Sequence, residues 1–189
     1  NLNPQLGSAT NLEPYLSGGS IKGLLQVRDH DLPGIAEALG GFAGALGDAM
    51  NAVHNANASS PAIGNRIGRQ TGLMGTDALN FTGKAAIGVV DANGVLKDRL
   101  SIDFGAGTIT SALSASTYSF AGGTIADLAT ALNSALGAEV PAGSASFANG
   151  ILSLDAGNGG GLVVQQDAAT PSDRAGRGFS HFFGLNDLV

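Results

Sequence analysis

Apolar residues recur at alternating intervals of three and four along residues 32–53 of this chain. Such spacing puts one apolar stripe along one side of an α-helix and is typical of a helix that packs lengthwise against another helix. With Ser20 as a suitable N-cap, the sequence predicts a long helical segment from about Ser20 to Asn55. We expect packing to bury this stripe, which consists of Leu32, Ile35, Leu39, Phe42, Leu46, Ala49 and Val53.

The same segment contains residues that weaken a helix. Pro33 lacks the N–H that a helix interior needs, so we expect a kink there, or a restart with Asp31 as cap. Each glycine costs about 1 kcal/mol of helix propensity relative to alanine. The helix is therefore expected to depend on partner helices, which its small residues would allow to approach closely. These glycines are Gly34, Gly40, Gly41, Gly44 and Gly47.

After residue 80 the apolar period changes from helical to two residues. A β-hairpin is predicted around Asn93-Gly94, because this dipeptide tolerates the positive φ angles of a type I′ turn. Short strands are expected near 107–110 and 117–120, and a last strand at 162–167. Asn149-Gly150 predicts a second hairpin between residues 144 and 156.

A second helix is predicted between these hairpins. Thr124 is its N-cap, Asp127 occupies the third helical position, and Gly137 is expected to end it. The apolar residues that follow Thr124 have the spacing of a buried helix face. One helix and several strands at this spacing predict a small α+β domain.

The fold class expected for the whole chain is α+β, with a long helical segment and an inserted β-rich domain that carries one helix. We expect residues 1–57 to be a helical rod segment, 58–80 a connector, 81–170 the inserted domain, and 171–189 a return to the helical part. The return segment, RGFSHFFGLNDLV, holds three of the eight phenylalanines. Phe179, Phe182 and Phe183 are predicted to pack on the helix around Phe42.

The composition argues against several classes of function. A net charge of −6 disfavours nucleic-acid binding, and Arg66 with Arg69, the nearest approach to a basic patch, is interpreted as solvated loop charge. No apolar run is long enough to span a bilayer, since Glu37 and Asp48 interrupt the helical segment. The absence of cysteine excludes disulfides and thiolate chemistry.

No motif for catalysis or metal binding is evident in the sequence. His30, His54 and His181 are far apart and lack metal-ligand spacing, and no Gly-x-Ser-x-Gly element is present. DAGNGGG, at 155–161, is a single glycine-rich stretch without the repeat that calcium-binding turns need. We therefore predict no catalytic residue, no cofactor and no metal site.

Three stretches carry a resemblance to a known family. GGSIKGLLQVRD at 18–29 and NAVHNAN at 51–57 lie on either side of the striped helix, and FSHFFGLND follows at 179–187. With these stretches in this order, the chain resembles the flagellar hook-associated protein 1 family, the first of two proteins that join the bacterial flagellar hook to its filament. The resemblance implies a central piece of such a protein.

The family implies an extracellular structural protein of the flagellum, exported unfolded through the flagellar type III route and needed for flagellum assembly and motility. Its partners would be further copies and other axial proteins, namely the hook protein and the second junction protein. No active site is implied, and Arg28 and Asp29 would serve in ion pairing or capping. The fragment alone is expected to be monomeric.

Two other classes of function remain open on the sequence. A secreted adhesin or carbohydrate-binding module with a helical stalk would expose Trp or Tyr platforms, but the chain has no Trp and only Tyr15 and Tyr118. An enzyme, such as a peptidoglycan hydrolase carried on a flagellar protein, would need a cleft with converging acids or a metal.

Overall fold

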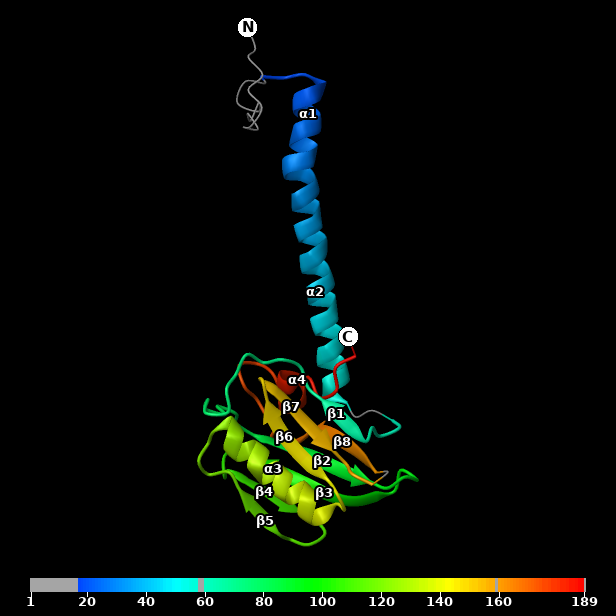
Figure 1. Ribbon diagram of the computed structural model, residues 1–189, viewed down its shortest axis with the longest axis vertical. Helices are drawn as coiled ribbons and strands as arrows, with labels where there is room; N and C mark the ends of the chain where they lie inside the picture. The colour runs from blue at the N-terminus through cyan, green and yellow to red at the C-terminus, as the bar shows by residue number, and fades with distance from the viewer. Residues whose placement is uncertain (1–16, 58–59, 159, 189) are drawn as a thin grey trace, which may run out of the picture. The chain divides into compact units, whose positions relative to one another are not determined.

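Figure 1 shows the computed structural model, which describes residues 17–57, 60–158 and 160–188. The chain divides into two compact units, Asn1–Gly47 and Asp48–Val189. The end of the long helix, the expected connector and the return segment all belong to the second unit. The boundaries expected after residues 57, 80 and 170 therefore differ from the division in the structure. Residues 1–16 of the expected rod segment lie outside the described residues.

The long helix begins at about the expected residue, but its N-cap is Gly19, so the prediction of Ser20 as the N-cap is wrong. α1 (Ser20–Gln26) leads into one π-helical turn, Val27–Asp31, and then into α2 (Leu32–Ala56). The helix predicted from about Ser20 to Asn55 is thus confirmed. The alternative of a restart at Pro33, with Asp31 as cap, is wrong, because the chain widens into the π turn and passes through Pro33 in helical conformation.

Five antiparallel strands form the larger sheet of the second unit, in the order β5-β4-β3-β2-β8. Along β3 the buried side chains alternate, as expected for a strand with one face on the core, whereas residues 85–87, 89 and 90 of β2 are all buried. Ile87 of β2 pairs with Leu100 of β3 and with Val164 of β8, and all three are fully buried. The strands are β2 (Lys84–Val90), β3 (Leu96–Asp103), β4 (Thr108–Ser111), β5 (Thr117–Ser119) and β8 (Gly161–Gln166).

Three shorter strands form a second antiparallel sheet, in the order β1-β7-β6. They are β1 (Asn65–Ile67), β6 (Ser144–Ala148) and β7 (Ile151–Asp155). β1 falls within 58–80, where the sequence predicts only a connector, and that prediction is wrong for these residues. A strand of three residues is too short to show a period, and β1 forms by pairing with β7, where Arg66 lies opposite Leu154.

α3 (Ile125–Glu139) lies beside the small sheet, and together they cover one face of the five-stranded sheet (Figure 1). Leu132 and Leu136 of α3 and Leu154 of β7 enter the same core as Ile87 and Ile102. Burial of such side chains stabilises the fold by about 1.5–3 kcal/mol each. A short helix, α4 (Phe179–Phe183), completes the unit, and the expected α+β fold class is confirmed.

The two Asn-Gly turns have different geometries. Asn149 and Gly150 both have positive φ, 50° and 78°, so the β6–β7 hairpin has the predicted type I′ turn. In the β2–β3 hairpin only Gly94 has positive φ. There the Asp91 carboxylate accepts from the amides of Asn93 and Val95, at 2.9 and 3.0 Å, so this longer loop is held by a side chain. The hairpin is confirmed, but the prediction of its turn type is wrong.

α3 starts with the predicted capping box. Thr124 Oγ1 accepts from the Asp127 amide at 3.2 Å, and Asp127 Oδ2 accepts from the Thr124 amide at 3.0 Å. The Thr124 hydroxyl, which also donates to Asp127, lowers the pKa of that carboxyl. The helix continues through Gly137 to Glu139, so the predicted end at Gly137 is wrong; Pro141 follows two residues after the helix.

Replacing Thr124 with alanine is expected to lower the free energy of unfolding by about 1 kcal/mol, because the Asp127 amide at the start of α3 loses its acceptor, Thr124 Oγ1. The matched control is Thr130→Ala, an exposed threonine in the middle of α3. Alanine is the better helix former there, so this control should not destabilise the protein. Chemical denaturation measures both variants, and equal losses would contradict the role of the cap.

Candidate interaction surface

The apolar stripe of the long helix is exposed within this chain. Its large side chains keep between 49% and 69% of their surface accessible to solvent: Leu32, Ile35, Leu39, Phe42, Leu46 and Val53. An exposed apolar surface of this extent is uncommon on a monomeric protein and marks a site of interaction. That another helix buries these residues remains a prediction.

Glycines occupy the other side of α2. Each helical residue advances about 100° around the axis, which places Gly41 and Gly44 opposite Leu39. A Cβ added to Gly40, Gly41 or Gly44 would meet no atom of the described chain within 4 Å. Contacts within the described residues therefore do not require glycine at these positions, and the small side leaves room for another backbone to approach.

Arg28 and Asp29 form the ion pair that the family resemblance implies. Arg28 Nε and Nη2 donate to the two carboxylate oxygens of Asp29, at 2.6 and 2.7 Å. This hydrogen bonding lowers the pKa of Asp29. Both residues are solvent-exposed, so the pair contributes little to stability.

The phenylalanines of the return segment are buried in the second unit. Phe179 and Phe183 are fully buried, and both contact Phe81, with ring centroids 6.1 and 5.9 Å away. Phe182 meets Phe81 edge to face at 5.3 Å. The expectation that these rings pack on the helix around Phe42 is therefore corrected. They complete the core between the sheets, which brings together aromatic residues that are distant in the sequence.

A cation covers this aromatic cluster. The Arg174 guanidinium carbon lies 4.5 Å from the ring centroid of Phe182 and 5.8 Å from that of Phe81. Partial burial lowers the pKa of Arg174. A guanidinium over an aromatic face contributes about 0.5–1 kcal/mol at an exposed site, so Arg174 helps to hold Phe182 in place.

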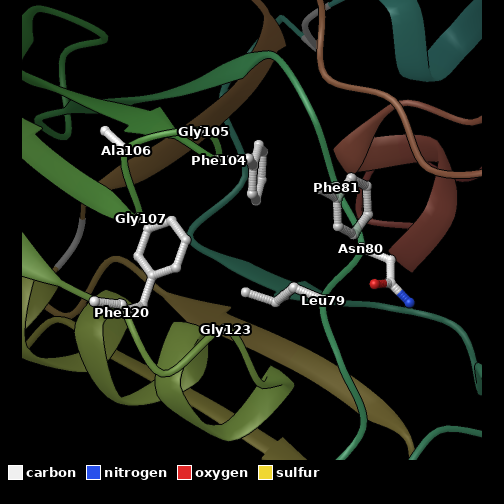
Figure 2. A pocket seen from close by; sticks show the side chains of 10 residues that line it. Leu79, Asn80, Phe81, Phe104, Gly105, Ala106, Gly107, Phe120 and Gly123 are labelled. Carbon is white, nitrogen blue, oxygen red and sulfur yellow. The ribbon is translucent and has the colours of Figure 1, made fainter.

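A shallow hollow of about 260 Å³ opens beside the same cluster. Figure 2 shows the rings of Phe81, Phe104 and Phe120 and the Leu79 side chain arranged around it. The remaining lining is Asn80 and the segments 105–107, 121 and 123. The lining contains no acid, base or other charged group, so the hollow has no residue suited to catalysis.

The return segment contacts the last two turns of α2, where the buried asparagines Asn51 and Asn55 lie. Asn55 Oδ1 accepts from Ser180 Oγ at 2.6 Å and from the backbone amide of Asn186 at 3.1 Å. Asn55 Nδ2 donates to Asp187 Oδ1 at 2.7 Å. Asn55 is 1% exposed, and its bonds to Ser180 and Asn186 are buried.

Two further bonds extend this contact by one turn of the helix. Asn51 Oδ1 accepts from the Leu188 amide at 2.9 Å, and His54 Nδ1 lies 2.7 Å from the Asn186 carbonyl oxygen. We call residues 51–57, together with 180 and 185–188, the helix–tail junction. It holds the end of α2 against the C-terminal residues of the same unit through bonds from side chains to side chains and to the main chain.

Arg66 of β1, a strand of the small sheet, anchors the junction. Its Nε and Nη2 donate to Leu162 O at 2.9 and 2.7 Å, and its Nη1 donates to Leu185 O at 3.1 Å and to Asn186 Oδ1. The side chain is only 3% exposed, and burial lowers its pKa. The interpretation of Arg66 as solvated loop charge is therefore wrong.

Arg69 also binds the return segment, so its interpretation as solvated loop charge is wrong. Its backbone amide donates to Phe183 O at 2.7 Å, its Nη2 donates to His181 O, and its Nε lies 3.3 Å from Asp187 Oδ2. Burial, with further contributions from Arg69 and Arg177, lowers the pKa of His181. His181 therefore stays neutral near neutral pH.

The structure does not gather the sequence's histidines into a site for chemistry. His54 and His181 belong to the second unit, and His30 lies in the π turn of the first. Within the described ranges, no three His, Cys, Asp or Glu side chains are placed to hold a metal ion. None of the described helices combines the length and the apolar character needed to cross a bilayer.

Sequence reasoning missed Arg66, Asn51 and Asn55 as anchors. NAVHNAN, at 51–57, contains both asparagines and His54. The family resemblance therefore singled out this stretch but did not show that its side chains bind the return segment. The partners that they bind at residues 185–188 are more than 100 residues away in the chain, and no local pattern shows such a pairing.

Comparison with known proteins finds a match for the part of the chain that contains the long helix. Residues 2–67 match the family model described as the helical domain of flagellar hook-associated protein FlgK. No curated protein and no solved structure matches the chain. The matched residues include the striped helix and β1. Residues 2–67 therefore belong to the helical domain of the flagellar hook-associated protein FlgK family, a structural family of the bacterial flagellum, as the resemblance in the sequence predicted.

Proposed function

We propose that this chain is part of an extracellular axial protein that joins the flagellar hook to the filament, with a structural and not an enzymatic role. The observation that carries the proposal is the FlgK helical-domain match over residues 2–67. The exposed stripe of α2 lies within that match and supplies a surface for helix–helix packing. Its occupant would be a helix of the parent protein or of a neighbouring axial subunit.

The helix–tail junction supports the proposal that the β unit is an outer domain inserted into a helical rod. The chain enters this unit along the last turns of α2, and residues 186–188 return to Asn51 and Asn55. Entry and exit at one place allow a domain to be added to a rod without rearranging it. The partners we propose in the parent protein are further copies, the hook protein and the second junction protein.

No observation favours the adhesin or carbohydrate-binding alternative. Tyr118 is half-buried, and its hydroxyl donates to Glu139 Oε1 at 2.8 Å, so the ring does not form a free platform. Tyr15 lies outside the described residues.

The full-length parent is expected to restore swarming to a strain that lacks the hook–filament junction protein. Introducing Leu39→Glu into that parent is expected to reduce the swarm diameter to that of the deletion strain, because a buried unpaired carboxylate strongly disfavours packing of the stripe. Swarm plates and electron microscopy of attached filaments measure the effect.

The matched control is Glu37→Lys. Glu37 lies on the side of the helix opposite Leu39, and this change also alters the charge. Normal swarming with Glu37→Lys, together with loss in Leu39→Glu, supports the stripe as the assembly surface. Failure of the unaltered parent to restore filaments would remove the junction role altogether.

A further inference from the structure

A single π-helical turn separates α1 from α2. The Leu32 amide donates to the Val27 carbonyl, a bond that spans five residues, and Pro33 follows immediately. Proline has no N–H, and in an α-helix its ring collides with the carbonyl four residues earlier, here that of Asp29. A wider turn before Pro33 relieves this conflict without ending the helix.

The π turn also changes which residues of α1 continue the apolar stripe. One extra residue in a turn shifts everything before it by one position, about 100° around the axis. In an unbroken α-helix, the three-four spacing carried back from Leu32 would reach Arg28 and then Leu25. After the π turn, the same line reaches Val27 and then Leu24.

The surroundings of these side chains agree with that shift. Leu24 and Val27 are exposed, as the stripe residues of α2 are. The guanidinium of Arg28 is held by both carboxylate oxygens of Asp29. An apolar side chain therefore takes the place on the stripe that a charged one would otherwise occupy.

We propose that Pro33 and the π turn set the register of this helix, so that Leu24 and Val27 continue the α2 stripe from Leu32 to Leu46. One helix can then pack along the whole length without burying the charge of Arg28. The inference rests on the proposed function insofar as a helix covers the stripe. The register itself is a property of this chain and can be measured alone.

Pairs of introduced histidines measure the register, since two histidines one turn apart on a helix chelate zinc. In a His30→Ala chain, the pair Val27→His with Leu32→His is five residues apart and is compared with Arg28→His with Leu32→His, four apart. The π turn places the first pair one above the other. We expect it to bind Zn²⁺ about tenfold more tightly than the second pair, because its second ligand is already in place.

Adding Pro33→Ala to both chains is expected to reverse this order, because an unbroken α-helix aligns residues 28 and 32. Calorimetric titration with Zn²⁺ gives the affinities, and the His30→Ala chain gives the background. Tighter binding by the pair at 28 and 32 in the Pro33 chain, or absence of zinc binding by both pairs, would overturn the register. An unchanged order after Pro33→Ala would overturn the role of the proline.

This result is separable from the proposed function. A chain that passes the zinc test while its parent fails to restore filaments keeps the register and loses the junction role. If the parent restores filaments but the chain fails the zinc test, the junction role stands and the proposed role of Pro33 and the π turn in the helix register falls.

Discussion

Replacing Phe183 with alanine is expected to lower the free energy of unfolding by about 3–5 kcal/mol and the melting temperature by about 10 °C. Phe183 is fully buried, and its ring lies 5.1 Å from that of Phe182 and 5.5 Å from that of Phe179. Truncation leaves a cavity at the centre of an aromatic cluster, and the surrounding rings cannot all move to fill it. Thermal unfolding followed by circular dichroism measures the change.

The matched control is Phe42→Ala. Phe42 is 67% exposed, so its removal is expected to change stability by no more than about 0.5 kcal/mol. The comparison distinguishes packing of the return segment on the helix around Phe42 from its packing in the core of the second unit. Equal losses for the two variants would show that Phe42 and Phe183 share one core and would contradict the packing in the second unit.

Replacing Arg66 with leucine is expected to lower the free energy of unfolding by about 3 kcal/mol or more. The change removes the donors of Leu162 O, Leu185 O and Asn186 Oδ1. Each buried acceptor left without a partner costs about 1–3 kcal/mol, and leucine cannot supply a donor. Urea denaturation measures the loss, and hydrogen exchange at residues 185–188 is expected to accelerate, because the junction opens locally.

Arg99→Leu is the control for Arg66→Leu. Arg99 is exposed on β3, and the change removes the same charge and adds the same side chain. We expect its effect on stability to stay within about 0.5 kcal/mol. A loss as large as that of Arg66→Leu would attribute the effect to net charge instead of the buried hydrogen bonds.

Periodic features of the fold could be predicted from the sequence. The three-four spacing of residues 32–53 identifies the long helix, because only helical periodicity aligns those side chains. Thr124 and Asp127 identify the start of α3, and Asn149-Gly150 identifies its hairpin, since each of these signals acts over four residues or fewer. Local chemistry determines these features, so a single sequence is enough to find them.

Features that depend on distant partners could not be predicted. Arg66 has no local sign of burial, and its partners Leu185 and Asn186 follow about 120 residues later. The three phenylalanines of the return segment have no period that selects a partner surface, so the helix around Phe42 and the core near Phe81 were equally compatible with the sequence. Pro33 illustrates a different limit, because proline signals a conflict in the helix and not its resolution.

The order of strands in the larger sheet decides which strands expose main-chain groups at its edges. β5, at one edge, has only three residues, Thr117–Ser119, and they are polar or amphipathic. A short edge of this kind presents few main-chain groups to which a second sheet could add. The β5 edge therefore offers little to which a sheet of a second copy could add.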